Sequence, residues 1–204
     1  MIVKQKELAL LLSSLHSYSG GKAELEQYQT PSEIAADALW IASMQGDLRG
    51  KRVADLGCGN GIFGCGALAL GARSVLFLDT DRRALKRARE NVAALERYFK
   101  KTFLCVFLYK DVALFREHVD TVVQNPPFGV QEEHADRNFL LAAMKAKVAY
   151  SFHKLETRAF IETFVGNYHK TATLVATYAF PLKKTMVFHT KPVRYVDVGL
   201  WRIF

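Results

Sequence analysis

Four consecutive residues, Asn125-Pro126-Pro127-Phe128, have types that suit the binding of a planar amine. They follow an apolar stretch at 119–123 that is typical of a buried strand. The two prolines fix φ and remove two backbone donors, so the side-chain oxygen of Asn125 and the carbonyl of Pro126 would stay free to accept hydrogen bonds. Phe128 offers an aromatic face on which a base can stack. These residues therefore predict a pocket for the amino group of a base.

Methyl transfer is the reaction that such a pocket favours. An aromatic amine is a poor nucleophile because its lone pair is delocalised into the ring, and two acceptors on its N–H bonds help to localise that lone pair. The sulfonium of S-adenosylmethionine is already reactive, so an enzyme would act mainly by in-line positioning, which contributes about 7–11 kcal/mol in favourable cases. A strong base is not required, because the nitrogen proton becomes acidic once the methyl group has been transferred.

A glycine-rich segment at residues 55–61 reads Asp-Leu-Gly-Cys-Gly-Asn-Gly and predicts a nucleotide site. It lies between an apolar stretch and a helical stretch, the position at which a doubly wound sheet binds a nucleotide. Asp79 follows Gly57 by 22 residues, near the end of the next apolar stretch, where a carboxylate can accept hydrogen bonds from ribose hydroxyls. This segment favours the amine-pocket interpretation of Asn-Pro-Pro over the alternative of a simple turn.

Some of these residues have competing interpretations. Gly59-x-Gly61-x-x-Gly64 formally matches the pattern of dinucleotide-binding enzymes. In those enzymes the turn lies close to the start of the domain, whereas two helical stretches precede it here, and nothing downstream resembles a hydride-transfer site. Asp111 could reach the exocyclic amine of a bound adenine, or it could be a solvated loop acid. Thr30 could contact a cofactor, or it could only cap a helix.

The elements that must position these residues alternate along the chain. Apolar stretches typical of strands occur at 53–56, 75–78, 103–108, 119–123, 148–152, 171–180 and 193–203. Helical patterns occur at 4–15, 31–45, 62–70, 82–98, 138–147 and 157–168. Residues 30–33, Thr-Pro-Ser-Glu, match a capping box at the start of the second helical stretch. This order predicts an α/β fold with a mostly parallel sheet and helices on both faces.

The whole chain has 204 residues and no linker rich in Pro, Gly or Ser, so we expect a single domain spanning 1–204. The 28 Lys and Arg against 20 Asp and Glu give a formal net charge of +8, which favours a polyanionic partner such as nucleic acid. Three cysteines without a C-x-x-C pair predict neither a metal site nor a disulfide framework and fit a reducing cytoplasm. No signal peptide or membrane span is expected.

With these motifs the chain resembles the small archaeal and eukaryotic methyltransferase-like enzymes that make N6-methyladenosine in small-subunit ribosomal RNA. The likeness runs nearly end to end. Beyond Asp-Leu-Gly-Cys-Gly and Asn-Pro-Pro-Phe-Gly, it includes Leu-Glu-Gln-Tyr-Gln-Thr at 25–30, Tyr-Ser-Phe-His-Lys at 150–154 and Phe188-His189.

The resemblance implies a Rossmann-like sheet of seven strands with an antiparallel last strand, and N-terminal helices within 1–46 that cover the site of the cofactor, S-adenosylmethionine. The target base is expected at Asn125, Pro126, Pro127 and Phe128. The expected cofactor-binding residues are Gln27, Thr30, Asp55, Gly57, Cys58, Gly59, Gly61, Asp79, Thr80, Asp111, Val112 and Asn125. Eukaryotic relatives work with a small zinc-binding activator subunit, and this chain could do the same.

The RNA-contacting rim is expected at four basic residues near the end of the chain, although an ordinary solvated hairpin is an equal alternative. They are Lys183, Lys184, Lys191 and Arg194. Three rival functions remain: a protein glutamine N5-methyltransferase, which usually carries tyrosine where this chain has Phe128; a guanine-N2 methyltransferase; and a non-catalytic RNA-binding protein on the same scaffold.

Overall fold

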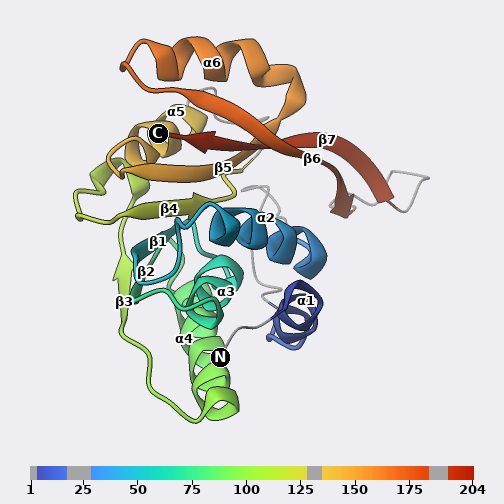
Figure 1. Ribbon diagram of the computed structural model, residues 1–204, viewed down its shortest axis with the longest axis vertical. Coiled ribbons are helices and arrows are strands. Elements are labelled where there is room, and N and C mark those ends of the chain that lie inside the picture. Colours follow the sequence, from blue (N-terminus) through green and yellow to red (C-terminus); the bar gives the residue numbers. More distant parts are fainter. Residues whose placement is uncertain (1–3, 18–28, 128–134, 184–192) are drawn as a thin grey trace.

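The computed structural model describes residues 4–17, 29–127, 135–183 and 193–204, which include a sheet of seven strands (Figure 1). The strand order is β3-β2-β1-β4-β5-β7-β6. The strands are β1 (Arg52–Leu56), β2 (Ser74–Asp79), β3 (Cys105–Tyr109), β4 (Thr121–Gln124), β5 (Val148–Lys154), β6 (Ala172–Lys183) and β7 (Val193–Ile203). Strands β1 to β5 are mutually parallel, and β7 runs antiparallel to both of its neighbours, as expected from the resemblance.

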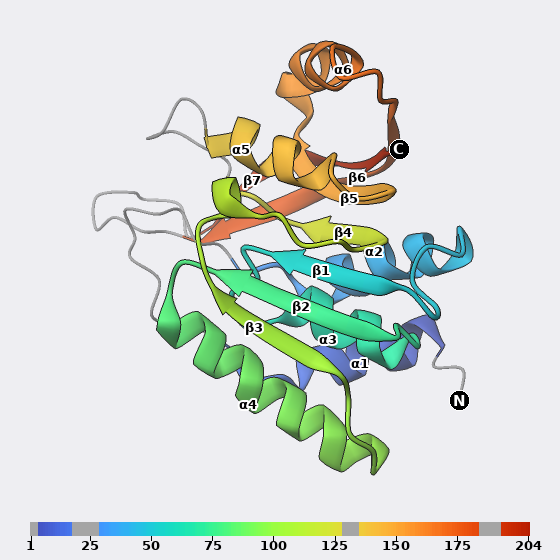
Figure 2. The same ribbon diagram turned by 90° about the vertical axis from the view of Figure 1, so that its left-hand side faces the viewer.

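Helices cover both faces of the sheet (Figure 2). On one face lie α1 (Gln5–Ser13), α2 (Ser32–Met44), α3 (Ile62–Ala69) and α4 (Arg82–Phe99). On the other lie α5 (Ala135–Ala143), α6 (Arg158–Gly166) and the short 3-10 helices η2 (Val112–Leu114) and η3 (Leu155–Thr157). The strands between them are apolar because both of their faces are buried, and this divides the interior into two cores.

Adjacent strand residues contribute to opposite cores. Val53 and Phe77 pack with α1 to α4, whereas Ala54 and Leu78 pack with η2, α5 and α6. The same alternation separates Gln124, which contacts α5, from Asn125, which contacts the segment before α2. One step along the chain therefore moves a side chain from one helical layer to the other.

Helices α1 and α2 pack against each other and on α3. Two side-chain hydrogen bonds also tie α2 to distant elements: the Tyr178 hydroxyl on β6 donates to Asp37 at 2.7 Å, and Gln5 on α1 donates to the other oxygen of Asp37 at 2.7 Å. These contacts hold α2 against α1 and β6. None of the helices in the described part of the chain is long and apolar enough to cross a membrane.

The expected order of strands and helices is confirmed, with two corrections. Helix α5 was expected at 138–147 but extends from Ala135 to Ala143, because the backbone then tightens into turns in which Lys145 and Ala146 donate to carbonyls three residues back. The capping-box prediction is wrong: Pro31 is the N-cap of α2, with no side-chain cap. The Thr30 hydroxyl instead contacts Asn125.

Candidate active site

The carboxyl ends of β1, β2 and β4 lie side by side, because these strands are parallel neighbours in register. Leu56 pairs with Leu78 on one side and with Gln124 on the other. The glycine-rich segment, Asp79 and Asn125 each follow or end one of these strands, so the structure brings the three sequence motifs to a single edge of the sheet. Parallel α/β sheets bind their ligands at this edge.

The glycine-rich segment needs its glycines for backbone geometry. Gly57, Gly59 and Gly61 all have positive φ, at 67°, 53° and 79°. A side chain at Gly57 would also meet the ring of Phe139 on α5, since its Cβ would lie 3.2 Å from that ring. The backbone of the turn is therefore left bare on the side where a ligand can approach closely.

Gly64 completes the pattern that formally matched dinucleotide-binding enzymes, and packing explains it. A Cβ at Gly64 would lie 2.1 Å from Cε1 of Phe77 on β2. Glycine at this position thus lets α3 approach the sheet, whatever ligand the turn binds.

Asp79 holds the glycine-rich turn in place while keeping free acceptor capacity. It ends β2, is buried, and accepts hydrogen bonds from the backbone N–H groups of Gly59 at 2.8 Å and Asp81 at 2.9 Å. Burial raises the pKa of Asp79, and the two N–H donors oppose that rise. An ionised carboxylate offers about four lone-pair sites, so acceptor sites remain for a ligand.

Gly61, the N-cap residue of α3, has no side chain that could cap the helix. The carboxylate of Asp55 on β1 caps it instead. One carboxylate oxygen accepts from the Gly64 N–H at 2.8 Å, while the other, Oδ1, is buried with no partner among the described residues. Burial raises the pKa of Asp55 well above its usual value. Cys58, next to the same turn, is also buried, and burial raises the pKa of its thiol, so it is not poised as a nucleophile.

The residues after β2 and β3 are less enclosed. Thr80 and Asp111 are exposed, and Val112 is buried. Asp111 caps η2, because its carboxylate accepts from the Ala113 N–H at 2.8 Å. Asp111 is therefore more than a solvated loop acid, because its carboxylate caps η2. A ligand that contacted this carboxylate would share it with the cap.

Asn125 is held by one end of its side chain and free at the other. Its Nδ2 donates to the Thr30 hydroxyl at 3.0 Å, across 95 residues of sequence. Its Oδ1 is buried and has no hydrogen-bond partner among the residues the structure describes. Because Thr30 orients the amide, the unpaired oxygen is a preset acceptor next to Pro126, which is itself buried.

Sequence reasoning missed a buried polar chain beneath α5. Gln124 Nε2 donates to the Phe139 carbonyl at 3.2 Å and to the Ser151 hydroxyl at 2.9 Å, and that hydroxyl lies 2.7 Å from His153 Nε2. Burial lowers the pKa of His153 to about 3, so the imidazole is neutral and can accept the Ser151 proton. The sequence signal for this chain was the presence of two polar residues, Ser151 and His153, at alternate positions of an apolar strand.

Several expected residues lie outside the described part of the chain, namely Gln27, Phe128, Lys184 and Lys191. Lys183 is the last residue of β6 and Arg194 is the second residue of β7, but only their backbone is described. Within the described ranges, no group of three or more His, Cys, Asp or Glu side chains could hold a metal ion.

A sheet in this order, with β7 inserted antiparallel between β5 and β6 and a glycine-rich turn after β1, defines a class I methyltransferase. Residues 34–166 match the model of the methyltransferase small domain, and the chain belongs to that family and is a methyltransferase. The dehydrogenase alternative is therefore wrong.

The chain is similar over nearly its whole length to named relatives. It is 33% identical to the rRNA N(6)-adenosine-methyltransferase METTL5 of Danio rerio, covering 96% of this chain and 95% of the relative. It is 30% identical to Mettl5 of Drosophila melanogaster, which has the same enzyme name, covering 98% and 96%. The crystal structure of PH1948 from Pyrococcus horikoshii superposes with a TM-score of 0.86 at 40% identity, covering 100% of this chain and 98% of that one.

Proposed function

We propose that the protein transfers a methyl group from S-adenosylmethionine to the N6 amine of an adenine in RNA, and that the RNA is small-subunit ribosomal RNA. The observation that carries this proposal is the buried Oδ1 of Asn125 after β4, which has no hydrogen-bond partner in the part of the chain that the structure describes. A buried acceptor without a partner costs free energy, so its retention is best explained by a donor that arrives with the substrate. An exocyclic amine is such a donor.

The carboxyl edge of the sheet fits the proposed cofactor. The bare backbone at Gly57 and Gly59 suits close approach of the methionine part, and the spare acceptor sites of Asp79 suit the ribose hydroxyls. Asp55, on β1 just before the turn, has one side-chain oxygen with no partner among the described residues. We assign Thr80, Asp111 and Val112 to the adenine side. When bound, S-adenosylmethionine supplies a methyl group on a positively charged sulfur.

The protein's own contribution to the chemistry is positioning. Asn125 Oδ1 accepts one N–H of the target amine, and the Pro126 carbonyl accepts the other. The nitrogen lone pair then forms the N–C bond as the C–S bond breaks, the electron pair stays on sulfur, and the amine gives up a proton. Both acceptors bind more strongly as positive charge develops on nitrogen, so their effect falls on the rate. Phe128 is assigned to stack on the base.

The RNA assignment is supported by the relatives named rRNA N(6)-adenosine-methyltransferases, which match almost the full chain, and by the net charge of +8. The small-subunit assignment rests on the family resemblance alone. We assign helices α1 and α2 as the cover of the cofactor site within one domain. Thr30, just before α2, joins this cover to Asn125 through a hydrogen bond.

A test combines nucleoside analysis with one variant. Purified protein and S-adenosylmethionine are incubated with unmodified small-subunit and large-subunit rRNA, and the digested nucleosides are analysed by mass spectrometry. We expect N6-methyladenosine from the small-subunit RNA, and for Asn125→Ala a single-turnover rate lower by at least about tenfold, the loss of roughly one hydrogen bond to a developing charge.

The alternatives give distinguishable products. N2-methylguanosine would identify a guanine-N2 enzyme, and methylation of protein glutamine alone would identify the glutamine N5 class. A protein that binds RNA but transfers nothing would be a binding module. Full turnover by Asn125→Ala on an adenine substrate would reject the catalytic assignment of this residue.

We further propose that a small zinc-binding subunit docks on the free edge of β3. This strand ends the sheet, so its backbone groups are available for pairing. Apolar side chains are unusually exposed along this edge: Leu104 at 65%, Val106 at 48% and Tyr109 at 57%. Co-purification of a zinc-containing partner with the wild type, but not with Val106→Glu, would test this assignment.

A further inference from the structure

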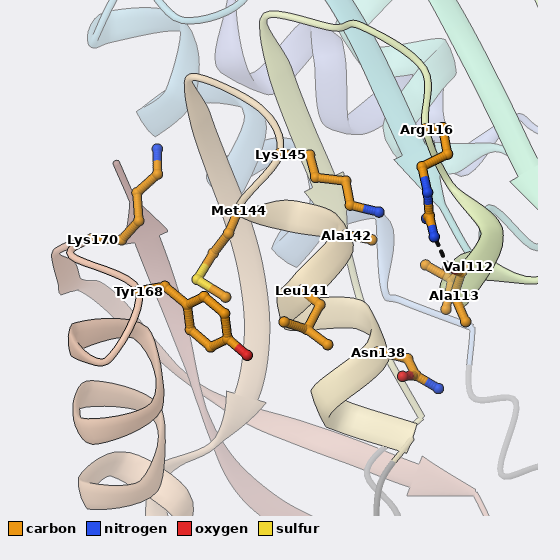
Figure 3. A pocket seen from close by; sticks show the side chains of 10 residues that line it. All are labelled: Val112, Ala113, Arg116, Asn138, Leu141, Ala142, Met144, Lys145, Tyr168 and Lys170. Atoms are coloured by element: carbon orange, nitrogen blue, oxygen red, sulfur yellow. Dashed lines mark hydrogen bonds between the residues drawn. The ribbon is translucent and has the colours of Figure 1, made fainter.

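A pocket of about 400 Å³ lies beside α5 (Figure 3). It extends from η2 across α5 to the end of α6. Its polar lining is mainly basic and amide-bearing. The polar side chains are those of Arg116, Asn138, Lys145, Tyr168 and Lys170.

The three cations of this pocket are hydrogen-bonded to backbone carbonyls rather than to carboxylates of the described residues. Among the described residues, Arg116, Lys145 and Lys170 form no ion pair, and the neighbouring Glu117 is paired with Lys110 at 2.6 Å. Their hydrogen bonds go to backbone carbonyls instead, as when Lys145 donates to Phe115 at 2.6 Å.

Two of these positive charges, those of Arg116 and Lys145, are also close enough to repel each other. Lys145 extends toward Arg116 in Figure 3, and burial, followed by the charge of Arg116, lowers the pKa of Lys145. Glu117, which is paired with Lys110, opposes this effect only in part, because the pKa of Lys145 is still lowered. An anion placed between them would relieve the repulsion.

An aromatic ladder on α6 and the turn that follows it adjoins this pocket. Phe160, Phe164 and Tyr168 follow one another at four-residue spacing, with ring centroids 5.4 Å apart at both steps. Phe160 is 36% exposed and Tyr168 51% exposed. At the other end of the ladder, the guanidinium of Arg137 on α5 lies 5.8 Å from the Phe160 ring. Cations interleaved with exposed aromatic rings form the usual surface for a single strand of nucleic acid.

The face connects to the candidate active site through the first turn of α5. Phe139 there lies against Gly57 of the cofactor turn, and its neighbour Asn138 lines the pocket. Asn138 lies within α5, and Lys145 lies two residues beyond its last residue, Ala143. A strand that leaves the target site at this end of α5 would therefore run along the helix toward the three cations.

We propose that the face formed by η2, α5 and α6 binds the single-stranded RNA backbone that flanks the target nucleotide. Phosphates bind at Arg116, Lys145 and Lys170, and a base stacks on Tyr168. This assignment rests on the proposed RNA substrate and is separate from the rim expected near residues 183–194.

The test measures binding of a short unstructured RNA oligonucleotide across a series of KCl concentrations, without methyl donor. In the groove variant, Arg116, Lys145 and Lys170 are all replaced by Gln. In the charge-matched control, three exposed residues on the opposite helical layer, Lys6, Lys86 and Arg97, are replaced by Gln. We expect the slope of log K against log salt to fall by roughly 2 in the groove variant, about 0.7 per phosphate contact, and not in the control.

Two further measurements separate the possible occupants. Tyr168→Ala should weaken RNA binding several-fold while Tyr168→Phe should not, because only the ring is needed for stacking. Inorganic phosphate should displace RNA no better than chloride at equal ionic strength. Stronger displacement by phosphate would mark a free-phosphate site and overturn the RNA assignment.

Equal salt slopes for the groove variant and its control would also overturn it, and would leave the aromatic ladder to be explained by a protein partner. Because the binding assay contains no methyl donor, its outcome is independent of catalysis. A wild type that binds RNA with the expected slope but produces no methylated nucleoside would reject the proposed function and leave this surface intact.

Discussion

At the scale of single residues, the candidate site is built from polar groups that are only partly satisfied. Asn125 donates a hydrogen bond from its amide nitrogen to Thr30, and Asp55 caps α3 with one carboxylate oxygen. The other side-chain oxygen of each residue has no partner among the residues that the structure describes. Buried polar groups elsewhere in proteins are nearly always paired. Both unpaired oxygens belong to residues at the carboxyl edge of the sheet, which is where a donor from a ligand would arrive.

Asp79→Ala should weaken binding of S-adenosylmethionine by about 1–3 kcal/mol, because the variant loses a charged acceptor for hydroxyl groups. The change also releases the Gly59 and Asp81 N–H groups, so the unfolding temperature must be measured beside the calorimetric titration. The matched control is Asp120→Ala, which removes a carboxylate just before β4, at the opposite edge of the sheet. Equal affinity for Asp79→Ala and wild type would refute the ribose assignment.

At the scale of elements, glycines decide how closely the helices approach the sheet. Gly64 on α3 faces Phe77 of β2, and Gly66 on the same helix faces Leu39 of α2 with a would-be Cβ 2.3 Å from its Cδ1. Helix α3 therefore packs tightly on the sheet and on α2 at once. This packing of α3 therefore also fixes the position of the glycine-rich turn that precedes it.

Gly64→Ala should destabilise the fold by about 1–3 kcal/mol, since the added methyl group overlaps the Phe77 ring. Gly166→Ala is the matched control, because it ends α6 with nothing within 4 Å of the added Cβ and should be neutral or slightly stabilising. Urea denaturation measures both. Similar unfolding free energies for the two variants would contradict the packing explanation of the glycine pattern.

Much of this arrangement could be predicted from the sequence, because parallel strands deliver their carboxyl ends to one edge. That rule predicts that the glycine turn, Asp79 and Asn125 share this edge, and the strand order then places Asp79 and Asn125 on opposite sides of the turn. It could not predict the Thr30–Asn125 hydrogen bond, whose partners are 95 residues apart, and the local capping pattern at Thr30 pointed to a different role. The Gln124–Ser151–His153 chain depends on cross-strand register, which periodicity does not report.

At the scale of the whole molecule, buried titratable groups make stability depend on pH. His153 is 3% exposed and neutral when folded, with a pKa of about 3 against 6.5 in the unfolded chain. Between these values the unfolded state binds a proton that the folded state does not. The stabilisation from His153 is therefore complete above pH 6.5 and is lost as the pH falls below it.

His153→Gln should remove this part of the pH dependence. Relative to the variant, the wild type should lose about 2 kcal/mol of unfolding free energy between pH 7.5 and pH 5, which corresponds to roughly one and a half units at 1.36 kcal/mol each. Urea denaturation at a series of pH values gives the comparison. Parallel curves for the two proteins would mean that His153 takes up a proton in the folded state after all.

The position of β7 has a consequence for synthesis on the ribosome. This strand lies between β5 and β6, yet it follows both in the chain. In the nascent polypeptide, β5 therefore has an open edge until residues 155–192 and then β7 have emerged. Trp201 and Leu200, both fully buried in the finished sheet, cannot enter the interior before that point. Unpaired strand edges template association with other chains. The interval before β7 inserts is therefore when the newly made protein is most open to aggregation and most in need of a chaperone.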